Sequence, residues 1–299
     1  MAKSDEAWCK VQESKEVTMG DEDLRSPTSP HETHSVLQER GASVIDFRLN
    51  YLAVVFIPAS DIQPKPDMIV TVVKAFQDKE FIPGTFHEMP SPAGPPQTRL
   101  RMSSSNNEWQ LNFGSKRVQI AKNMLDQRGS NLGSVSDFCS DALDLYGRVF
   151  NIIKKKASRL AVVTTFLLKE MTLNELQKAY FNLFHTTRSY AETPPIEWNW
   201  RSANRQSLDL DGFTDKINIS TTAERVKGEI SAPSGLAPLD RIRIRLDLNT
   251  IPENTENRFS MGHLAAFLNQ IPGLHDSRLN EITELISGQV QENSYCSHS

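Results

Sequence analysis

The chain has 299 residues, a formal net charge of -4 and 38% hydrophobic residues. A nearly neutral charge gives no whole-molecule reason for binding nucleic acid or a membrane surface, so such a partner would have to use a local patch. No apolar run approaches the ~18 residues of a transmembrane helix, and the first residues lack the apolar core of a signal peptide.

The cysteines bear on the cellular location of the protein, and the composition of its two ends bears on their order. The three cysteines, Cys9, Cys139 and Cys296, form no C-x-x-C pair, which argues against a disulfide framework or a zinc site. We therefore expect a cytoplasmic protein without a metal or cofactor. Residues 1–40 hold nine acidic and five basic residues and few large apolar ones. This composition predicts a disordered polar tail over residues 1–42, and residues 289–299 are expected to fray.

Residues 43–157 are predicted to form a first α+β half. The expected elements are a strand at Phe47–Ile57, a helix at Asp67–Gln77, strands at Glu80–Met89 and Thr98–Ser104, a hairpin within Glu108–Ala121, and a helix at Ser134–Lys156. The last helix begins with a capping-box pattern, Ser134 followed by Asp137.

The hairpin has the clearest pattern in the chain. Gly114-Ser115 suits a two-residue type II′ turn, which would pair Phe113 with Lys116 and Leu111 with Val118. This register puts the apolar side chains of both strands on one face, so we expect an antiparallel sheet with one buried face.

Residues 158–288 are predicted to form a second α+β half. The expected elements are a strand at Arg159–Lys169, a helix from Thr172 to Phe184, a strand at Ile196–Ser202, one long strand or a hairpin over Lys216–Ile230, a strand at Arg241–Leu248, and a helical region at Arg258–Ser287 that is broken or bent at Pro272-Gly273.

Both halves follow the same order: an apolar strand, a short helix, several antiparallel strands and a long helix. The chain is therefore predicted to be an α+β protein with long helices packed on one face of one or more antiparallel sheets. We also expect the two β-α-β-β-β-α halves to be related by a pseudo-two-fold duplication.

Several motifs resemble those of a known family. They are FIPGTFHEM, a W-x-L-x-F strand, a helix ending in LYGRVFNII, and a D-x-N strand before the last long helix. Together they are similar to a sporadically distributed family of uncharacterised bacterial α+β proteins, over about residues 45–287. The resemblance implies a cytoplasmic α+β protein and provides no active-site residues.

Common catalytic signatures are missing from the sequence. There is no Walker A motif, no G-x-G-x-x-G, no G-x-S-x-G and no H-E-x-x-H. Asp209, Asp211 and Asp215 lie close together in SLDLDGFTDK, and a D-x-D pair on a strand could hold a divalent cation. Asp-Gly is also a hairpin-turn former, and this second interpretation is favoured.

Two strands carry arginines at alternate positions, which places their side chains on one face. These candidate nucleic-acid-binding residues are Arg99 and Arg101 in the first half and Arg241, Arg243 and Arg245 in the second. Arginine forks suit phosphate groups. Stacking could come from Trp198, Trp200 or Tyr51 if they are exposed. The favoured interpretation is that the arginines lie on an ordinary solvated face and pair with Glu197, Glu229 and Asp247, because the net charge gives no support for nucleic-acid binding.

The sequence leaves three functional hypotheses. The first is a non-enzymatic interaction protein that binds another protein or itself, as a component, sensor or immunity-type factor of a bacterial conflict or defence system. The second is a nucleic-acid-binding protein that uses the arginine-bearing strands. The third, least favoured, is a metal-dependent enzyme built on Asp209, Asp211 and a distant acid.

Overall fold

The computed structural model describes residues 44–58, 62, 64–89, 94–184, 190, 192–232 and 235–288. All of these residues belong to one compact unit. The predicted polar tail and the predicted frayed C-terminus lie outside the described residues.

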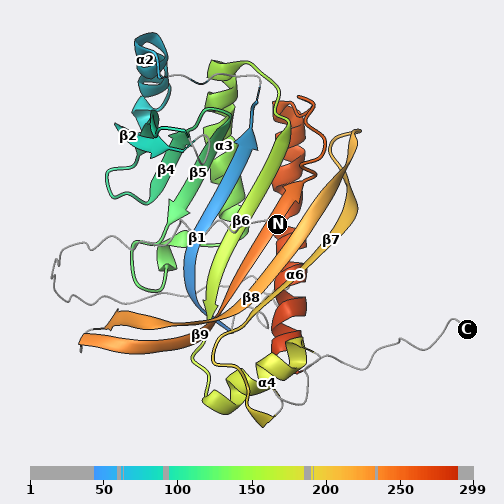
Figure 1. Ribbon diagram of the computed structural model, residues 1–299. Helices are drawn as coiled ribbons and strands as arrows, with labels where there is room; N and C mark the ends of the chain where they lie inside the picture. Colours follow the sequence, from blue (N-terminus) through green and yellow to red (C-terminus); the bar gives the residue numbers. More distant parts are fainter. Residues whose placement is uncertain are drawn as a thin grey trace, which may run out of the picture. The chain divides into compact units, whose positions relative to one another are not determined.

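One antiparallel sheet forms the framework (Figure 1). Its nine strands lie in the order β2-β3-β4-β5-β1-β6-β9-β8-β7. Their bounds are β1 Ile45–Phe56, β2 Ile82–Glu88, β3 Gln97–Ser103, β4 Trp109–Phe113, β5 Arg117–Asn123, β6 Arg159–Leu168, β7 Asn199–Asp209, β8 Thr214–Ala232 and β9 Gly235–Thr250. The apolar strands β1 and β6 pair at the centre, and β2 and β7 form the two edges.

Four α-helices are described: α2 Pro66–Ala75, α3 Val135–Ile153, α4 Leu173–Leu183 and α6 Met261–Ser287. The long helices α3 and α6 lie side by side on one face of the sheet (Figure 1). Capping boxes start three of them, at Ser134, Thr172 and Ser260, because each hydroxyl accepts a hydrogen bond from an otherwise unpaired N–H group. The predicted α+β fold with an antiparallel sheet is confirmed.

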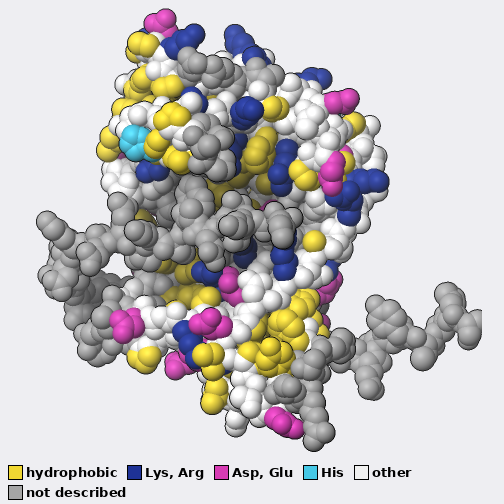
Figure 2. All heavy atoms as spheres, in the orientation of Figure 1, with side chains coloured by type: hydrophobic (Ala, Val, Ile, Leu, Met, Phe, Trp, Pro, Cys, Tyr) yellow, Lys and Arg dark blue, Asp and Glu magenta, His cyan; other side chains and the backbone are white. Residues whose placement is uncertain are grey.

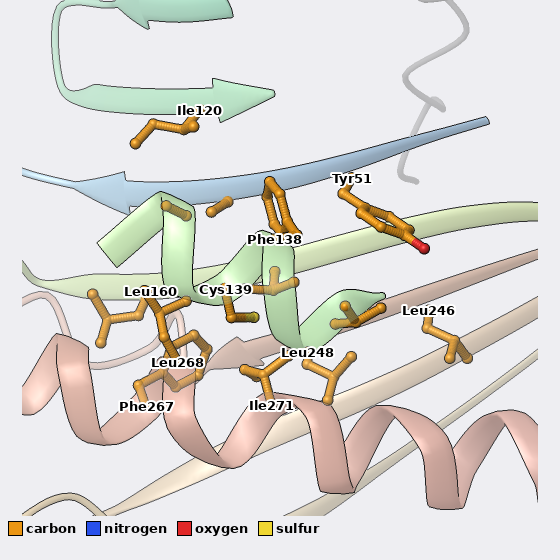
Figure 3. Close-up of a cluster of buried hydrophobic side chains, with 14 of the residues drawn as sticks. Tyr51, Ile120, Phe138, Cys139, Leu160, Leu246, Leu248, Phe267, Leu268 and Ile271 are labelled. Carbon is orange, nitrogen blue, oxygen red and sulfur yellow. The ribbon is translucent and has the colours of Figure 1, made fainter. Parts of the chain in front are cut away.

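The core fills the space between the sheet and these two helices. Leu246 and Leu248 point from β9 toward α6, where Leu248 lies near Ile271, and Phe138 of α3 lies near Tyr51 of β1 (Figure 3). The rings of Tyr51 and Phe138 are 5.4 Å apart between centroids. Alternation along β9 explains this arrangement, because every second side chain of a strand points to the same face.

A buried tyrosine fixes α3 against the centre of the sheet. The hydroxyl of Tyr146 lies 2.8 Å from the carbonyl oxygen of Ala53 and 3.1 Å from that of Val118. Burial raises the pKa of Tyr146 well above its ordinary value, so the hydroxyl keeps the proton that it donates. One side chain thereby joins α3 to both β1 and β5.

The β4–β5 hairpin exists, but its predicted register is wrong. Phe113 pairs with Val118 and Leu111 with Ile120, and the N–H of Gly114 donates to the carbonyl of Arg117, so the two turn residues are Ser115-Lys116 rather than Gly114-Ser115. The shift of two residues leaves the predicted faces unchanged. The turn has distant partners: the backbone carbonyls of Lys116 and Ser115 accept hydrogen bonds from the N–H groups of Ile57 and Ile62. No local sequence signal reports such contacts.

Other predicted elements need smaller corrections. β7 starts at Asn199 and continues to Asp209, whereas Ile196 lies before it and is 68% exposed. The region predicted as a long strand or a hairpin is one strand, β8. Helix α6 starts three residues later than predicted and runs through Pro272 without a break.

The two halves have related strand orders. In each half the last strand lies beside the first: β5 beside β1 and β9 beside β6. The first half, however, has four strands between its helices, one more than the predicted scheme. Duplication therefore stays a prediction.

Candidate interaction surface

The two predicted arginine groups lie on the same face of the same sheet. Strand pairing places Arg101 opposite Asn112 on β4, and this row of neighbours continues across β5, β1 and β6 to Asn249 on β9. Arg241, Arg243 and Arg245 share the face of Asn249, because they are an even number of residues away. Four strands separate the two groups, a distance of about 24 Å at ~4.8 Å per strand.

We call this side, opposite α3 and α6, the arginine face. Among the described strands it carries nine arginines: Arg99, Arg101, Arg117, Arg159, Arg201, Arg205, Arg241, Arg243 and Arg245. Its carboxylates are fewer: Glu88, Asp209, Glu224 and Asp247 lie on the strands, and Asp46, Glu170 and Glu253 reach the face from outside it. Lysine and arginine side chains are visible on this side of the molecule (Figure 2). The face therefore has a local positive character that the net charge conceals.

Arg99 is a buried structural residue. It is 5% exposed, and its Nε lies 3.0 Å from a carboxylate oxygen of Glu88. It also donates to the side chain of Gln97 and the backbone oxygen of Ile62. The same Glu88 oxygen accepts from the N–H of Ser115 in the hairpin loop. Arg99 thus ties β2, β3 and the segment before α2 together.

Arg101 is half-buried. Its Nε donates to Oδ1 of Asn112 at 2.8 Å, and its guanidinium lies 5.5 Å from the ring centroid of Phe86. Partial burial lowers the pKa of Arg101. Its polar contacts lie along the sheet, so Arg101 is held in place from two neighbouring strands.

Arg241 and Arg243 form ion pairs that differ from the predicted ones. Arg241 lies 2.6 Å from Asp46 and stacks over Phe47, and Arg243 lies 2.7 Å from Glu224. The predicted partners were Glu197, Glu229 and Asp247. Asp46 is 195 positions from Arg241 along the chain, so only the pairing of β1, β6 and β9 brings the two together.

Arg245 belongs to an exposed group that includes two arginines missed by the sequence analysis. It lies across Thr222 of β8 from Arg201 of β7, and Arg205 follows on the same face of β7. All three arginines are exposed. Arg205 was missed because the predicted strand ended at Ser202, and Arg201 was missed because the next alternate position of that strand, Ala203, is not an arginine. Residues 202–207 have no apolar alternation that would extend the strand prediction to Arg205.

The aromatic residues proposed for base stacking lie elsewhere. Tyr51 is 1% exposed and Trp198 is 8% exposed. Trp200 is half-buried on the helix side of β7. None of these three rings lies on the arginine face.

A groove runs along the helix side of the edge strand β7. It has a volume of about 90 Å³, and its walls come from β7, β8 and the second half of α6. Trp200, Ile219, Ile282 and Leu285 supply apolar surface, and Ser202, Asn204, Thr221, Arg278 and Glu281 supply polar groups. Arg278 and Glu281 form an ion pair of 2.6 Å on the wall that α6 contributes.

The three clustered aspartates form a turn, as the favoured interpretation predicted. Asp211 and Gly212 have φ angles of 59° and 78°, the left-handed values of a type I′ hairpin turn. Asp209 accepts a hydrogen bond from the N–H of Gly212, and Asp215 forms a buried ion pair of 2.8 Å with Arg258. Within the described ranges, no three His, Cys, Asp or Glu side chains gather as a metal site.

Burial makes Cys139 chemically inert. It lies in α3, and burial raises its pKa to about 12, so the thiol stays protonated. The other two cysteines lie outside the described residues.

Comparison with protein-family models and with curated proteins found no match. The resemblance to a sporadically distributed bacterial family therefore stays a prediction. None of the described helices is long and apolar enough to cross a membrane.

Proposed function

We propose that this chain is a non-enzymatic interaction protein that binds another protein along β7 and the adjacent part of the arginine face. The observation that carries this proposal is that an edge strand, exposed arginines and a groove lie together at one side of the sheet. β7 has eleven residues and, among the described strands, pairs only with β8; it has exposed arginines on one face and a groove on the other. Aromatic, polar and arginine side chains in such proximity are typical of protein interfaces.

The arginines are suited to recognition because neighbours hold them in place. Arg205 donates to Asn218 and to Glu253, both at 2.7 Å, and Arg201 donates to the hydroxyl of Ser220 at 3.1 Å. A side chain that is already ordered loses less entropy when a partner binds. Such charges steer encounter and select partners of opposite charge.

The biological role that we propose is a component, sensor or immunity-type factor of a bacterial conflict or defence system. Its support is the resemblance to sporadically distributed bacterial proteins, since such a distribution suits accessory systems. The fold itself carries no information about this role.

Affinity capture with matched charge variants tests the proposal. The full chain is compared with Arg201→Glu/Arg205→Glu and with Lys74→Glu/Lys178→Glu, whose lysines are exposed on α2 and α4. We expect the first variant to lose the natural partner and the second, with the same change in charge, to keep it. Equal retention by all three proteins contradicts the proposal.

Nucleic-acid binding is a second candidate because arginines outnumber carboxylates on one face. The absence of Tyr51, Trp198 and Trp200 from that face removes the proposed stacking groups, which makes this candidate the weaker one. It predicts binding to DNA or RNA that weakens steeply as salt rises. Equal and weak binding by wild type and by Arg201→Ala/Arg205→Ala/Arg245→Ala rejects it, and the same comparison for Arg241→Ala/Arg243→Ala/Arg245→Ala covers the arginines predicted from sequence.

A further inference from the structure

Strand pairing shows which backbone groups of β7 face solvent. The carbonyl of Trp198 accepts from the N–H of Arg225, and the N–H of Leu210 donates to the carbonyl of Phe213. Residues of an antiparallel strand alternate between bonding to the neighbour and pointing away from it. Even-numbered residues of β7 therefore bond to β8, and odd-numbered residues turn their N–H and C=O groups to the free edge.

The same alternation separates the side chains of β7. The outward-bonding residues Asn199, Arg201, Ala203, Arg205 and Ser207 place their side chains on the arginine face. Trp200, Ser202 and Asn204 place theirs along the groove. A strand added at this edge would have one row of side chains beside the arginines and the other row over the groove.

Nothing within β7 prevents such an addition. The strand contains neither proline nor glycine, and it offers outward N–H and C=O groups over most of its length. Natural sheets usually protect long edges with prolines, bulges or charges. The charged residues of β7 are Arg201, Arg205 and, at its last position, Asp209. The two arginines repel a basic strand and attract an acidic one.

The arginines also disfavour one of the registers in which a second copy of this chain could pair at the same edge. An antiparallel β7–β7 contact centred on Ala203 would place Arg201 directly opposite Arg205. Like charges in directly opposed positions are destabilising. Acidic residues at those positions of an added strand would have their Cβ atoms about 4.5–5.5 Å from the arginine Cβ atoms, which is within reach of ion pairing.

We propose that β7 receives an extended acidic segment of a partner protein as a tenth strand of the sheet. Acidic side chains of the segment pair with Arg201 and Arg205, and its alternate, uncharged side chains lie over the groove near Trp200. This inference rests on the proposed function and specifies how the partner binds. Main-chain hydrogen bonds supply affinity and the alternating side chains supply specificity, as in other strand-addition complexes.

A fluorescent peptide of alternating glutamate and valine, about eight residues long, tests the proposal by anisotropy with the full-length protein. We expect saturable binding that is lost when lysine replaces glutamate. A peptide with proline at two of the valine positions should also fail, because it cannot pair as a strand. No binding by about 1 mM peptide, or equal binding of all three peptides, overturns the proposal.

Ala203→Pro separates strand addition from simple charge attraction. Proline removes an outward N–H that bonds to no neighbouring strand, so the sheet should stay intact. We expect binding of the acidic peptide to weaken at least about tenfold in Ala203→Pro. The matched control Ala203→Ser keeps the N–H and should bind within about twofold of wild type.

Hydrogen exchange gives a signature that only strand addition produces. The acidic peptide should slow exchange at the outward amides of Arg201, Ala203 and Arg205 and change the already bonded amides of Ser202 and Asn204 little. Protection elsewhere overturns the proposal. Concentration-dependent dimers that Ala203→Pro abolishes also overturn it, because they identify a second copy as the occupant.

The two proposals fail in different ways. If natural-partner capture is lost in Arg201→Glu/Arg205→Glu but kept in Ala203→Pro, the interaction function stands and strand addition is rejected. If neither variant affects capture, both proposals are rejected.

Discussion

At one edge of the sheet, β2 runs for seven residues and contains Pro83 and Gly84; at the other, β7 runs for eleven residues and contains neither. A proline has no N–H group to offer, and a glycine weakens a strand. The end of β2 is also fixed by the buried pair of Arg99 and Glu88. β7 has its arginines on the surface instead. The difference indicates that one edge is closed to further strands and the other is kept available.

The comparison also shows that burial decides what an arginine does. Arg99 and Arg201 both lie on the arginine face within one strand of an edge. Arg99 is enclosed by its partners, whereas Arg201 is exposed. The first contributes to folding, and the second is available for binding.

The largest effect is expected at the closed edge. Arg99→Met leaves the carboxylate of Glu88, whose side chain is 11% exposed, without its counter-charge. Breaking a buried ion pair from one side costs about 3–5 kcal/mol of unfolding free energy. Urea unfolding measures the loss. Arg201→Met, the surface counterpart, should change stability by no more than about 0.5 kcal/mol, and equal effects at both positions would contradict the assigned roles.

Proline substitutions in β7 should cause a smaller loss of stability, and the loss should alternate between residues that bond to β8 and residues that face the free edge. Asn204→Pro removes an N–H that bonds to β8, and the unpaired carbonyl costs about 1–3 kcal/mol. Ala203→Pro, one residue earlier, removes an outward N–H and should cost clearly less. Thermal unfolding of the two variants compares them directly. A larger loss for Ala203→Pro would reverse the assignment of the bonded and free edges.

Acid should lower the free energy of unfolding by about 1 kcal/mol or less through the ion pair that joins β8 to β9 near the start of β7. Arg225 lies 2.6 Å from Asp240 and donates to the backbone of Pro195 just before β7. Its hydrogen bond to Asp240 lowers the pKa of that carboxyl below its ordinary value. The stabilisation is therefore complete above the unfolded pKa of about 3.9 and is lost as the pH falls through the folded pKa.

Urea unfolding at pH 6 and at pH 3 measures this contribution. Asp240→Asn should lower stability at pH 6 and reduce its further loss at pH 3. An unchanged dependence on pH in that variant would show that other carboxylates carry the effect.

The smallest effect on stability is expected from opening the closed edge. Pro83→Thr/Gly84→Thr gives β2 the composition of an ordinary strand, with a change of about 0.5 kcal/mol or less at exposed positions. The restored N–H should instead raise self-association. Sedimentation velocity over a range of concentrations measures this, and a variant that stays monomeric would show that Pro83 is not what protects β2.

Local patterns predicted most of the strands and helices, because apolar alternation and capping boxes are local signals. The capping box at Ser134 forms as predicted. The hairpin register was wrong because Ile57 and Ile62 bond to its loop. The arginine pairing was wrong for a similar reason, since Asp46 reaches Arg241 across 195 residues. Arg205 was not predicted as a strand residue because residues 202–207 have no apolar alternation.

The pairing of β1 with β6 has a consequence for the order of events during synthesis. Phe56 pairs with Arg159 and Ile45 with Leu168, so the partners are 103 to 123 residues apart. At ~5–20 residues per second, the ribosome needs about 5–25 seconds to supply β6 after β1. During this interval β1 can pair with β5, while the other side of its apolar segment stays unprotected. The nascent chain is then most exposed to aggregation or to the action of a chaperone, before the second half exists.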